Sequence, residues 1–275
     1  MKKKSLDLSG QKIKNINSDV FNKDFIKSIK IMHFNGNYLR KIEKVKDISL
    51  DVSNKDFFKS VKILYLNGNY ITKIENLKLF PNLEVLFLSG NVIKSIENLD
   101  SLSNLKTLDL SANKIEKIQG LSGLKNLESL LINSNYVEKI EGLDSLNNLK
   151  KLRLSGNKIA KIENLDNLKK LEMLDLFSNN IKEIKNLNSL LNLRSLYLGK
   201  NQISKIENLD KLIKLRTLVL DRNFITKLEN LHQLSNLREI SIADNPISNP
   251  EYLKKCKNLE EIYPEALKFK REIIK

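Results

Sequence analysis

The stretch Leu105-Lys-Thr-Leu108-Asp-Leu110-Ser-Ala-Asn113 contains the pattern that decides the fold. Its spacing is apolar, two variable residues, apolar, one variable, apolar, two variable, asparagine. The same pattern ends at ten asparagines, which from Asn69 onward fall every 22 residues: Asn37, Asn69, Asn91, Asn113, Asn135, Asn157, Asn179, Asn201, Asn223 and Asn245. One unit of this length cannot bury its apolar face alone, so the pattern predicts a stack of repeats sharing one core.

Each repeat is expected to contain a strand and a return segment. Around Leu108-Asp-Leu110 the apolar residues alternate with the period of a strand, so the leucines point inward and the residues between them point outward. Stacked copies make a parallel sheet with strands about 4.8 Å apart. The return segment, such as Ile115 to Leu124, is expected to be extended or 3₁₀ structure and bulkier than the strand. This difference predicts an array that bends, with the sheet on its concave face.

Two asparagine columns have structural roles in this scheme. The ten asparagines above, the ladder asparagines, are expected in the core, where each amide pairs with backbone groups at the turn leaving its strand. A second column alternates Asn and Gly, two residue types that tolerate a left-handed backbone: Asn76, Asn98, Gly120, Gly142, Asn164, Asn186, Asn208 and Asn230.

The chain of 275 residues is predicted to form a single domain over 1–275. Repeats are irregular over 1–60, regular over 61–245, and followed by a cap over 246–275. The units at 22–29 and 54–61 resemble each other and predict a longer outer-side excursion. Pro250 suits the first turn of a helix, so the C-terminal cap is expected to be helical.

Composition narrows the function classes. The formal net charge of +15 invites a nucleic-acid hypothesis. However, Lys four residues after the ladder asparagine and Glu two residues later form neighbouring columns of opposite sign, which predicts a solvated, mutually paired flank. Cys256 is the single cysteine, and no signal peptide or membrane-spanning run is evident, so an intracellular, cytoplasmic or nuclear, monomeric protein is expected.

The phrase Asn-x-Ile-x-Lys-Ile-Glu-Asn-Leu, at 69–77 and 201–209, is similar to the 22-residue class of leucine-rich repeats. Within that class, residues 193–201 and 171–176 resemble the leucine-rich-repeat regulatory subunit family of type-1 serine/threonine protein phosphatase. The resemblance implies an α/β leucine-rich-repeat solenoid, a curved right-handed superhelix with a concave parallel sheet. It further implies no catalytic activity, and docking of the phosphatase catalytic subunit on the concave face. Tyr263-Pro264 after Ile262 departs from that family's cap.

The outward positions of the strands supply the candidate binding residues. Aromatic side chains there gain nothing from the core and are enriched among interface hot spots, whereas carboxylates suit a basic partner. The predicted protein-binding residues are Tyr65, Phe87, Asp109, Arg153, Asp175, Phe177, Tyr197, Asp221 and Glu239. The alternative for the aromatics is that they pack against one another across strands.

An enzyme is not expected. His33 and His232 are the only histidines, predicted on opposite sides, and Cys256 has no histidine near it in the scheme. No cluster has the spacing of a metal site, so neither metal nor cofactor is expected. The predicted function is a non-enzymatic module that binds another folded protein. Two alternatives stay open: a generic repeat scaffold for a bacterial or cytoskeletal partner, and a ribonucleoprotein component.

Overall fold

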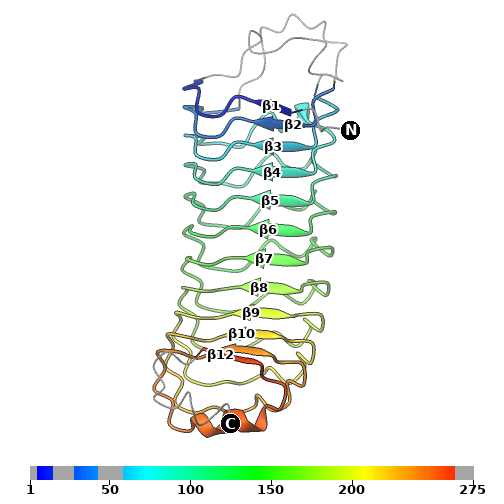
Figure 1. Ribbon diagram of the computed structural model, residues 1–275. Coiled ribbons are helices and arrows are strands. Elements are labelled where there is room, and N and C mark those ends of the chain that lie inside the picture. The colour runs from blue at the N-terminus through cyan, green and yellow to red at the C-terminus, as the bar shows by residue number, and fades with distance from the viewer. Residues whose placement is uncertain (1–4, 15–27, 43–57, 264–275) are drawn as a thin grey trace, which may run out of the picture. The chain divides into compact units, whose positions relative to one another are not determined.

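The computed structural model describes residues 5–14, 28–42 and 58–263, and the chain divides into two compact units at Tyr136 and Val137. Each unit is a parallel β-sheet solenoid in which consecutive strands pair in sequence order (Figure 1). The first unit contains β1 Ser5–Asp7, β2 Ile31–His33, β3 Ile63–Tyr65, β4 Val85–Phe87, β5 Thr107–Asp109 and β6 Ser129–Leu131. The second contains β7 Lys151–Arg153, β8 Met173–Asp175, β9 Ser195–Tyr197, β10 Thr217–Val219, β11 Glu239–Ser241 and β12 Glu261–Tyr263. The single domain over 1–275 stays a prediction.

The strands are three residues long and stack with the repeat in register. Leu86 lies beside Leu108 on the next strand, and Phe87 lies beside Asp109, because this pairing joins residues 22 apart. The middle residue of these strands is buried and its two neighbours are less so. The apolar residues of one repeat illustrate the core: Leu105, Leu108, Leu110 and Ile115 are each 0% exposed. The strand alternation predicted from sequence is therefore confirmed.

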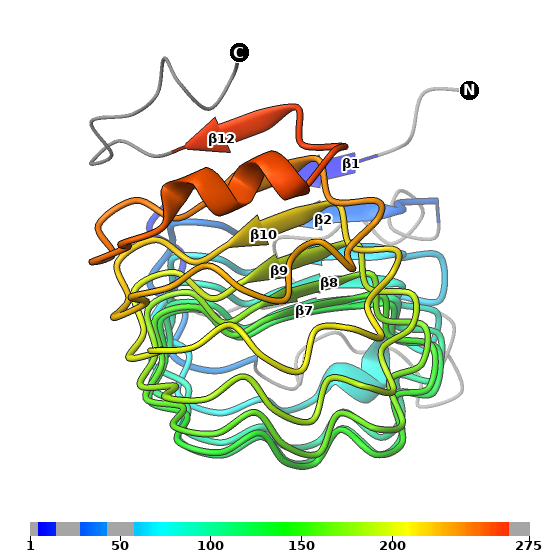
Figure 2. The same ribbon diagram turned by 90° about the horizontal axis from the view of Figure 1, so that it is seen from below.

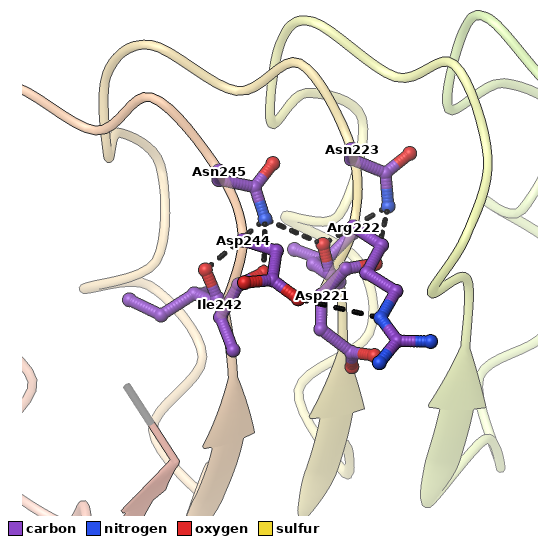
Figure 3. Close-up of polar contacts among 8 residues, drawn as sticks. Asp221, Arg222, Asn223, Ile242, Asp244 and Asn245 are labelled. Atoms are coloured by element: carbon purple, nitrogen blue, oxygen red, sulfur yellow. Dashed lines mark hydrogen bonds and ion pairs between the residues drawn. The ribbon is translucent and has the colours of Figure 1, made fainter. Parts of the chain in front are cut away.

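The ladder asparagines join successive repeats, as predicted. The Nδ2 of Asn113 donates to the carbonyls of Leu88 and Leu110, each at 3.0 Å, and its Oδ1 accepts the backbone N–H of Ile93 at 3.0 Å. Asn223 and Asn245 have the same arrangement of Nδ2 bonds, and Figure 3 shows the bond from Asn245 to the carbonyl of Ile242. Nine of the ten ladder asparagines are buried, and Asn245 near the C-terminal end is partly buried. Each amide thus satisfies buried backbone groups of two repeats.

The second asparagine column has the left-handed backbone that the sequence predicted. Its φ angles run from 57° to 59° at asparagine and are 65° and 67° at Gly120 and Gly142. Where asparagine stands, its side chain adds a bond, as when Asn164 Nδ2 donates to the carbonyl of Ile140 at 2.7 Å. A further left-handed position, just before the ladder asparagine, was not foreseen; Ala112 and Arg222 occupy it with φ of 53° and 54°.

The prediction of a helical cap over 246–275 is wrong for the part that the structure describes. One short 3₁₀ helix, η3 (Pro250–Lys255), is followed by strand β12, as Figure 2 shows in orange and red. The reason is that the repeat pattern continues: Asn258 and Ile262 stand 22 residues after Asn236 and Ile240. Ile262 accordingly pairs in register with Ile240. Residues 264–275 lie outside the described residues.

The long N-terminal units are described only in part. The predicted excursions at 22–29 and 54–61 fall mainly outside the described residues. The second 3₁₀ segment, η2 (Leu77–Leu79), begins after the left-handed Asn76, and it contains the fully buried Leu77. The prediction of short 3₁₀ or extended return segments holds for this repeat.

Candidate interaction surface

The outward side chains of the strands form the candidate surface, here called the strand face. It consists of the residues six, four and two positions before each ladder asparagine. All nine predicted binding residues lie on it, but they are divided between the units. Tyr65, Phe87 and Asp109 belong to the first unit. Arg153, Asp175, Phe177, Tyr197, Asp221 and Glu239 belong to the second.

In the first unit, three rings stack on the strand face. His33 and Tyr65 have ring centroids 4.5 Å apart and planes 4° apart, and Tyr65 and Phe87 follow at 4.8 Å and 11°. The residues that alternate with them, Met32 and Leu64, fill the core behind. The rings therefore pack against one another across strands, as the alternative interpretation held, and they do so outside the core. Their edges remain a partly exposed apolar surface.

A second row of aromatic rings lies along the edge that follows the strands, at the position immediately after the ladder asparagine. We call Tyr38, Tyr70 and Tyr136 the edge tyrosines; they are 44%, 52% and 46% exposed. Tyr38 and Tyr70 stack with centroids 6.0 Å apart and planes 12° apart. They line a cavity of about 570 Å³ together with Lys14, Arg40 and Lys41. Sequence reasoning missed this row, although the position after each asparagine could have been compared from repeat to repeat.

In the second unit, Asp175 lies in a half-buried setting beside other candidate residues. Its Oδ1 accepts the backbone N–H of Phe177 at 3.1 Å, and its Cα neighbours in register are Arg153 and Tyr197. Burial raises the pKa of the Asp175 carboxyl, whereas the Phe177 amide and the Arg153 guanidinium act in the opposite direction. The Nη2 of Arg153 lies 3.6 Å from the Sδ of Met173. These residues form one connected group on β7, β8 and β9.

Phe177 covers the neighbouring repeat at a glycine. A Cβ added to Gly199 would lie 2.8 Å from the Phe177 ring and 3.1 Å from Oδ1 of Asp221. Gly199 is the buried member of a column in which other repeats carry side chains. The absence of a side chain at Gly199 thus gives the ring of Phe177 its place, and the Asp221 carboxylate also borders this glycine.

Three of the predicted carboxylates are already partly engaged. Oδ1 of Asp109 accepts the backbone N–H of Ser111 at 2.9 Å, in the same way that Oδ1 of Asp175 accepts the backbone N–H of Phe177. Oε2 of Glu239 accepts the Thr217 hydroxyl at 3.0 Å. Each carboxylate therefore has one oxygen committed to the fold. A partner would meet the remaining oxygen.

The expected pairing between the Lys and Glu columns is wrong over residues 58–263. The ion pair that those columns form there is Glu183 with Lys185, in the one repeat where the two residue types have exchanged places. Elsewhere the columns are solvated, as predicted. The cross-repeat ion pairs lie instead at the start of the strands, as between Lys62 and Glu84 at 2.9 Å. Both columns lie in the segment after the ladder asparagine, and within each column adjacent repeats present like charges.

The C-terminal region brings Cys256 and His232 to one cavity of about 640 Å³, which the sequence scheme did not foresee. Burial raises the pKa of the Cys256 thiol, so the thiolate needed for nucleophilic chemistry is disfavoured. His232 Nδ1 lies 2.8 Å from the Tyr252 hydroxyl, on the cavity wall. Within the described part of the chain, no group of three or more His, Cys, Asp and Glu is arranged to hold a metal ion.

No helix that the structure describes has both the length and the apolar character needed to cross a membrane.

Comparison with sequence families gives matches over most of the chain. A model described as "Leucine-rich repeat" matches residues 144–262, and one described as "Leucine Rich repeats (2 copies)" matches 59–101, 81–123 and 103–145. No catalytic family is indicated. A search of curated proteins found no match to this sequence.

Solved structures give the same fold. An internalin (inlF) from Listeria monocytogenes is 25% identical, with a TM-score of 0.72 over 94% of this chain and 80% of the other. A chain of the octameric complex of latrophilin 3, Unc5D and the leucine-rich-repeat protein FLRT2 is 24% identical, with a TM-score of 0.76 over 91% and 78%. The leucine-rich-repeat domain of APL1B is 19% identical, with a TM-score of 0.71 over 94% and 81%. At these identities the last two likenesses concern the fold alone.

Proposed function

Because the chain belongs to the leucine-rich-repeat family, whose members are typically non-enzymatic protein-interaction modules, we propose that it binds another folded protein. The docking residues lie on the strand face of each unit, with the edge tyrosines in the first. The observation that carries this proposal is the pair of aromatic rows in the first unit. The His33–Tyr65–Phe87 stack and the Tyr38–Tyr70 stack both lie outside the core.

Exposed, ordered rings are suited to protein docking. Stacking holds each ring in one orientation, so little side-chain entropy is lost when a partner covers it. Tyrosine also combines a large apolar area with a hydroxyl, and such residues dominate interface energetics. The edge tyrosines, at 44–52% exposed, retain about half of their surface for a partner.

The partner that we propose is the catalytic subunit of a type-1 serine/threonine protein phosphatase. Support comes from the resemblance of residues 171–176 and 193–201 to that enzyme's leucine-rich-repeat regulatory subunit. These two segments contain Asp175 and Tyr197, which are neighbours in register on β8 and β9. The match of sequence phrase and spatial adjacency makes this pair the first place to test.

The test measures binding of a purified type-1 catalytic subunit to the immobilised full chain by biolayer interferometry. The variants are Asp175→Lys/Tyr197→Ala in the second unit and Tyr65→Ser/Phe87→Ser in the first. Ile213→Ala is the matched control, because Ile213 is a 54% exposed apolar residue outside the strand face. Loss of hot-spot contacts of about 2 kcal/mol would weaken binding roughly 30-fold. The control should bind like the wild type.

The outcomes test separately the identity of the partner and the location of the docking face. Absence of phosphatase binding would reject this partner. A parallel pulldown analysed by mass spectrometry would then report whether another protein is captured and lost in the strand-face variants. If every captured protein binds both double variants as tightly as it binds the Ile213→Ala control, the docking face itself is wrong.

A further inference from the structure

The residue that begins each strand pairing, seven positions before the ladder asparagine, forms a column of alternating charge. We call it the strand-start column. In sequence order its members are Lys30, Lys62, Glu84, Lys106, Glu128, Lys150, Glu172, Arg194, Arg216 and Arg238, and Glu260 continues the column 22 residues after Arg238. Acidic and basic residues alternate from Lys62 to Arg194. The alternation then stops at three consecutive arginines.

The alternating part shows what the column contributes to folding. The carboxylate of Glu84 pairs with Lys62 and Lys106 on the two adjacent strands, each at 2.9 Å. In the second unit, Glu172 pairs with Arg194 at 3.8 Å and Glu260 pairs with Arg238 at 3.1 Å. Opposite charges directly across adjacent strands stabilise a sheet, and like charges destabilise it.

Arg216 departs from this rule. Its backbone N–H donates to the carbonyl of Arg194, and its own carbonyl accepts from Arg238, so the three arginines stand on consecutive strands. Strand spacing separates neighbours by about 4.8 Å. Arg216 is exposed and, over residues 58–263, makes no ion pair. A glutamate at this position would bridge Arg194 and Arg238 as Glu84 bridges its lysines, so the arginine forgoes stabilising contacts.

We propose that Arg194, Arg216 and Arg238 bind a short acidic segment of the protein partner. Guanidinium groups form paired hydrogen bonds with carboxylates, and arginine is enriched at interfaces. The row spans about 10 Å, and two carboxylates on alternate residues of an extended segment, about 7 Å apart, fit within that length. This inference rests on the proposed protein-docking function and adds the charge of the partner segment.

The boundaries of the row favour an acidic peptide over a nucleic acid. Glu172 stands at one end of the three arginines and Glu260 at the other, so the positive row is limited to three strands. The carboxylate of Glu239 is also exposed on β11 beside it. A polyphosphate backbone running along the column would meet these carboxylates, whereas a segment with two or three acids fits between them.

The experiment measures binding of a fluorescein-labelled hexaglutamate peptide to the full chain by fluorescence anisotropy at low salt. Arg216→Glu is compared with Lys227→Glu, which makes the same charge change from +15 to +13 at another exposed position of the second unit. We expect Arg216→Glu to raise the Kd at least tenfold and Lys227→Glu less than threefold. The melting temperature of Arg216→Glu should rise above that of the wild type. Arg216→Gln should raise the Kd without that gain in stability.

Three results would overturn the proposal. Equal weakening by Arg216→Glu and Lys227→Glu would mean that the peptide responds to net charge alone. A hexathymidylate that binds more tightly than the peptide, with the same loss in Arg216→Glu, would assign the row to nucleic acid. A melting temperature that does not rise would remove the argument that Arg216 forgoes ion pairs. None of these outcomes depends on the aromatic rows, whose variants test the docking function separately.

Discussion

Replacing Asn113 by alanine removes the bonds by which one ladder asparagine joins two repeats. Its Oδ1 is the acceptor for the backbone N–H of Ile93, and its Nδ2 donates to the carbonyls of Leu88 and Leu110. Asn113 is 7% exposed, and both leucines are fully buried. Water therefore has little access to the backbone groups that would lose their hydrogen bonds to Asn113.

The cost follows from which groups lose every partner. The Leu88 carbonyl keeps a bond from Asn91, and the Leu110 carbonyl keeps one from Asn135, since these two carbonyls each accept from two successive ladder asparagines. The amide of Ile93 loses its acceptor. One buried unpaired N–H costs about 1–3 kcal/mol and each lost shared bond about 1 kcal/mol. We expect Asn113→Ala to lower the free energy of unfolding by about 3–5 kcal/mol.

Asn245→Ala provides the matched control. Asn245 donates to the carbonyls of Leu220 and Ile242 in the same geometry, but it is only partly buried, so water can replace its amide (Figure 3). Its loss should cost about 1–2 kcal/mol. Urea unfolding followed by circular dichroism gives both free energies. Hydrogen exchange of the peptide containing Ile93 should report a protection loss in Asn113→Ala alone. Equal costs for the two variants, or unchanged protection at Ile93, would refute the reasoning.

Three further substitutions or reactions test other features. Gly120→Ala should destabilise the fold by about 2–4 kcal/mol in urea unfolding, because Gly120 has φ of +65° and a Cβ there would lie 2.5 Å from the Ile96 carbonyl oxygen. The control Gly36→Ala should cost only about 1 kcal/mol, because Gly36 has φ of +62° but open space around the added Cβ. Burial raises the pKa of the Asp175 carboxyl above its ordinary 3.8, so the folded protein holds that proton more tightly than the unfolded chain, and ionisation weakens the fold as the pH rises. Asp175→Asn should therefore be more stable than the wild type at pH 7 by thermal unfolding, and this advantage should vanish below about pH 3.8. Because burial raises the pKa of the Cys256 thiol, alkylation by iodoacetamide at pH 8 should be slower in the folded protein than in urea, and equal rates would contradict this placement.

The sequence by itself determined the repeat, the strand alternation and the asparagine ladder. These features depend on residues close together in the chain, such as Leu108-Asp-Leu110 and the Asn113 that follows them. With this spacing, stacking of the repeats both buries the leucines and provides hydrogen-bond partners for the backbone groups. For the same reason, left-handed Asn76 and Gly120 could be predicted from residue type alone.

Only the tertiary structure decided which side chains of different repeats touch. Sequence reasoning placed charge pairing in the Lys and Glu columns, but within each column adjacent repeats present like charges, and the pairs form at Glu84 and its counterparts. The stacking of Tyr38 on Tyr70 and the cavity that His232 and Cys256 both line were likewise missed. Such contacts depend on which residues of successive repeats lie side by side. The periodicity indicates these neighbours only when the same position is compared from one repeat to the next. Partner recognition lies at that level, because a surface is composed of residues 22 apart rather than of residues adjacent in the chain.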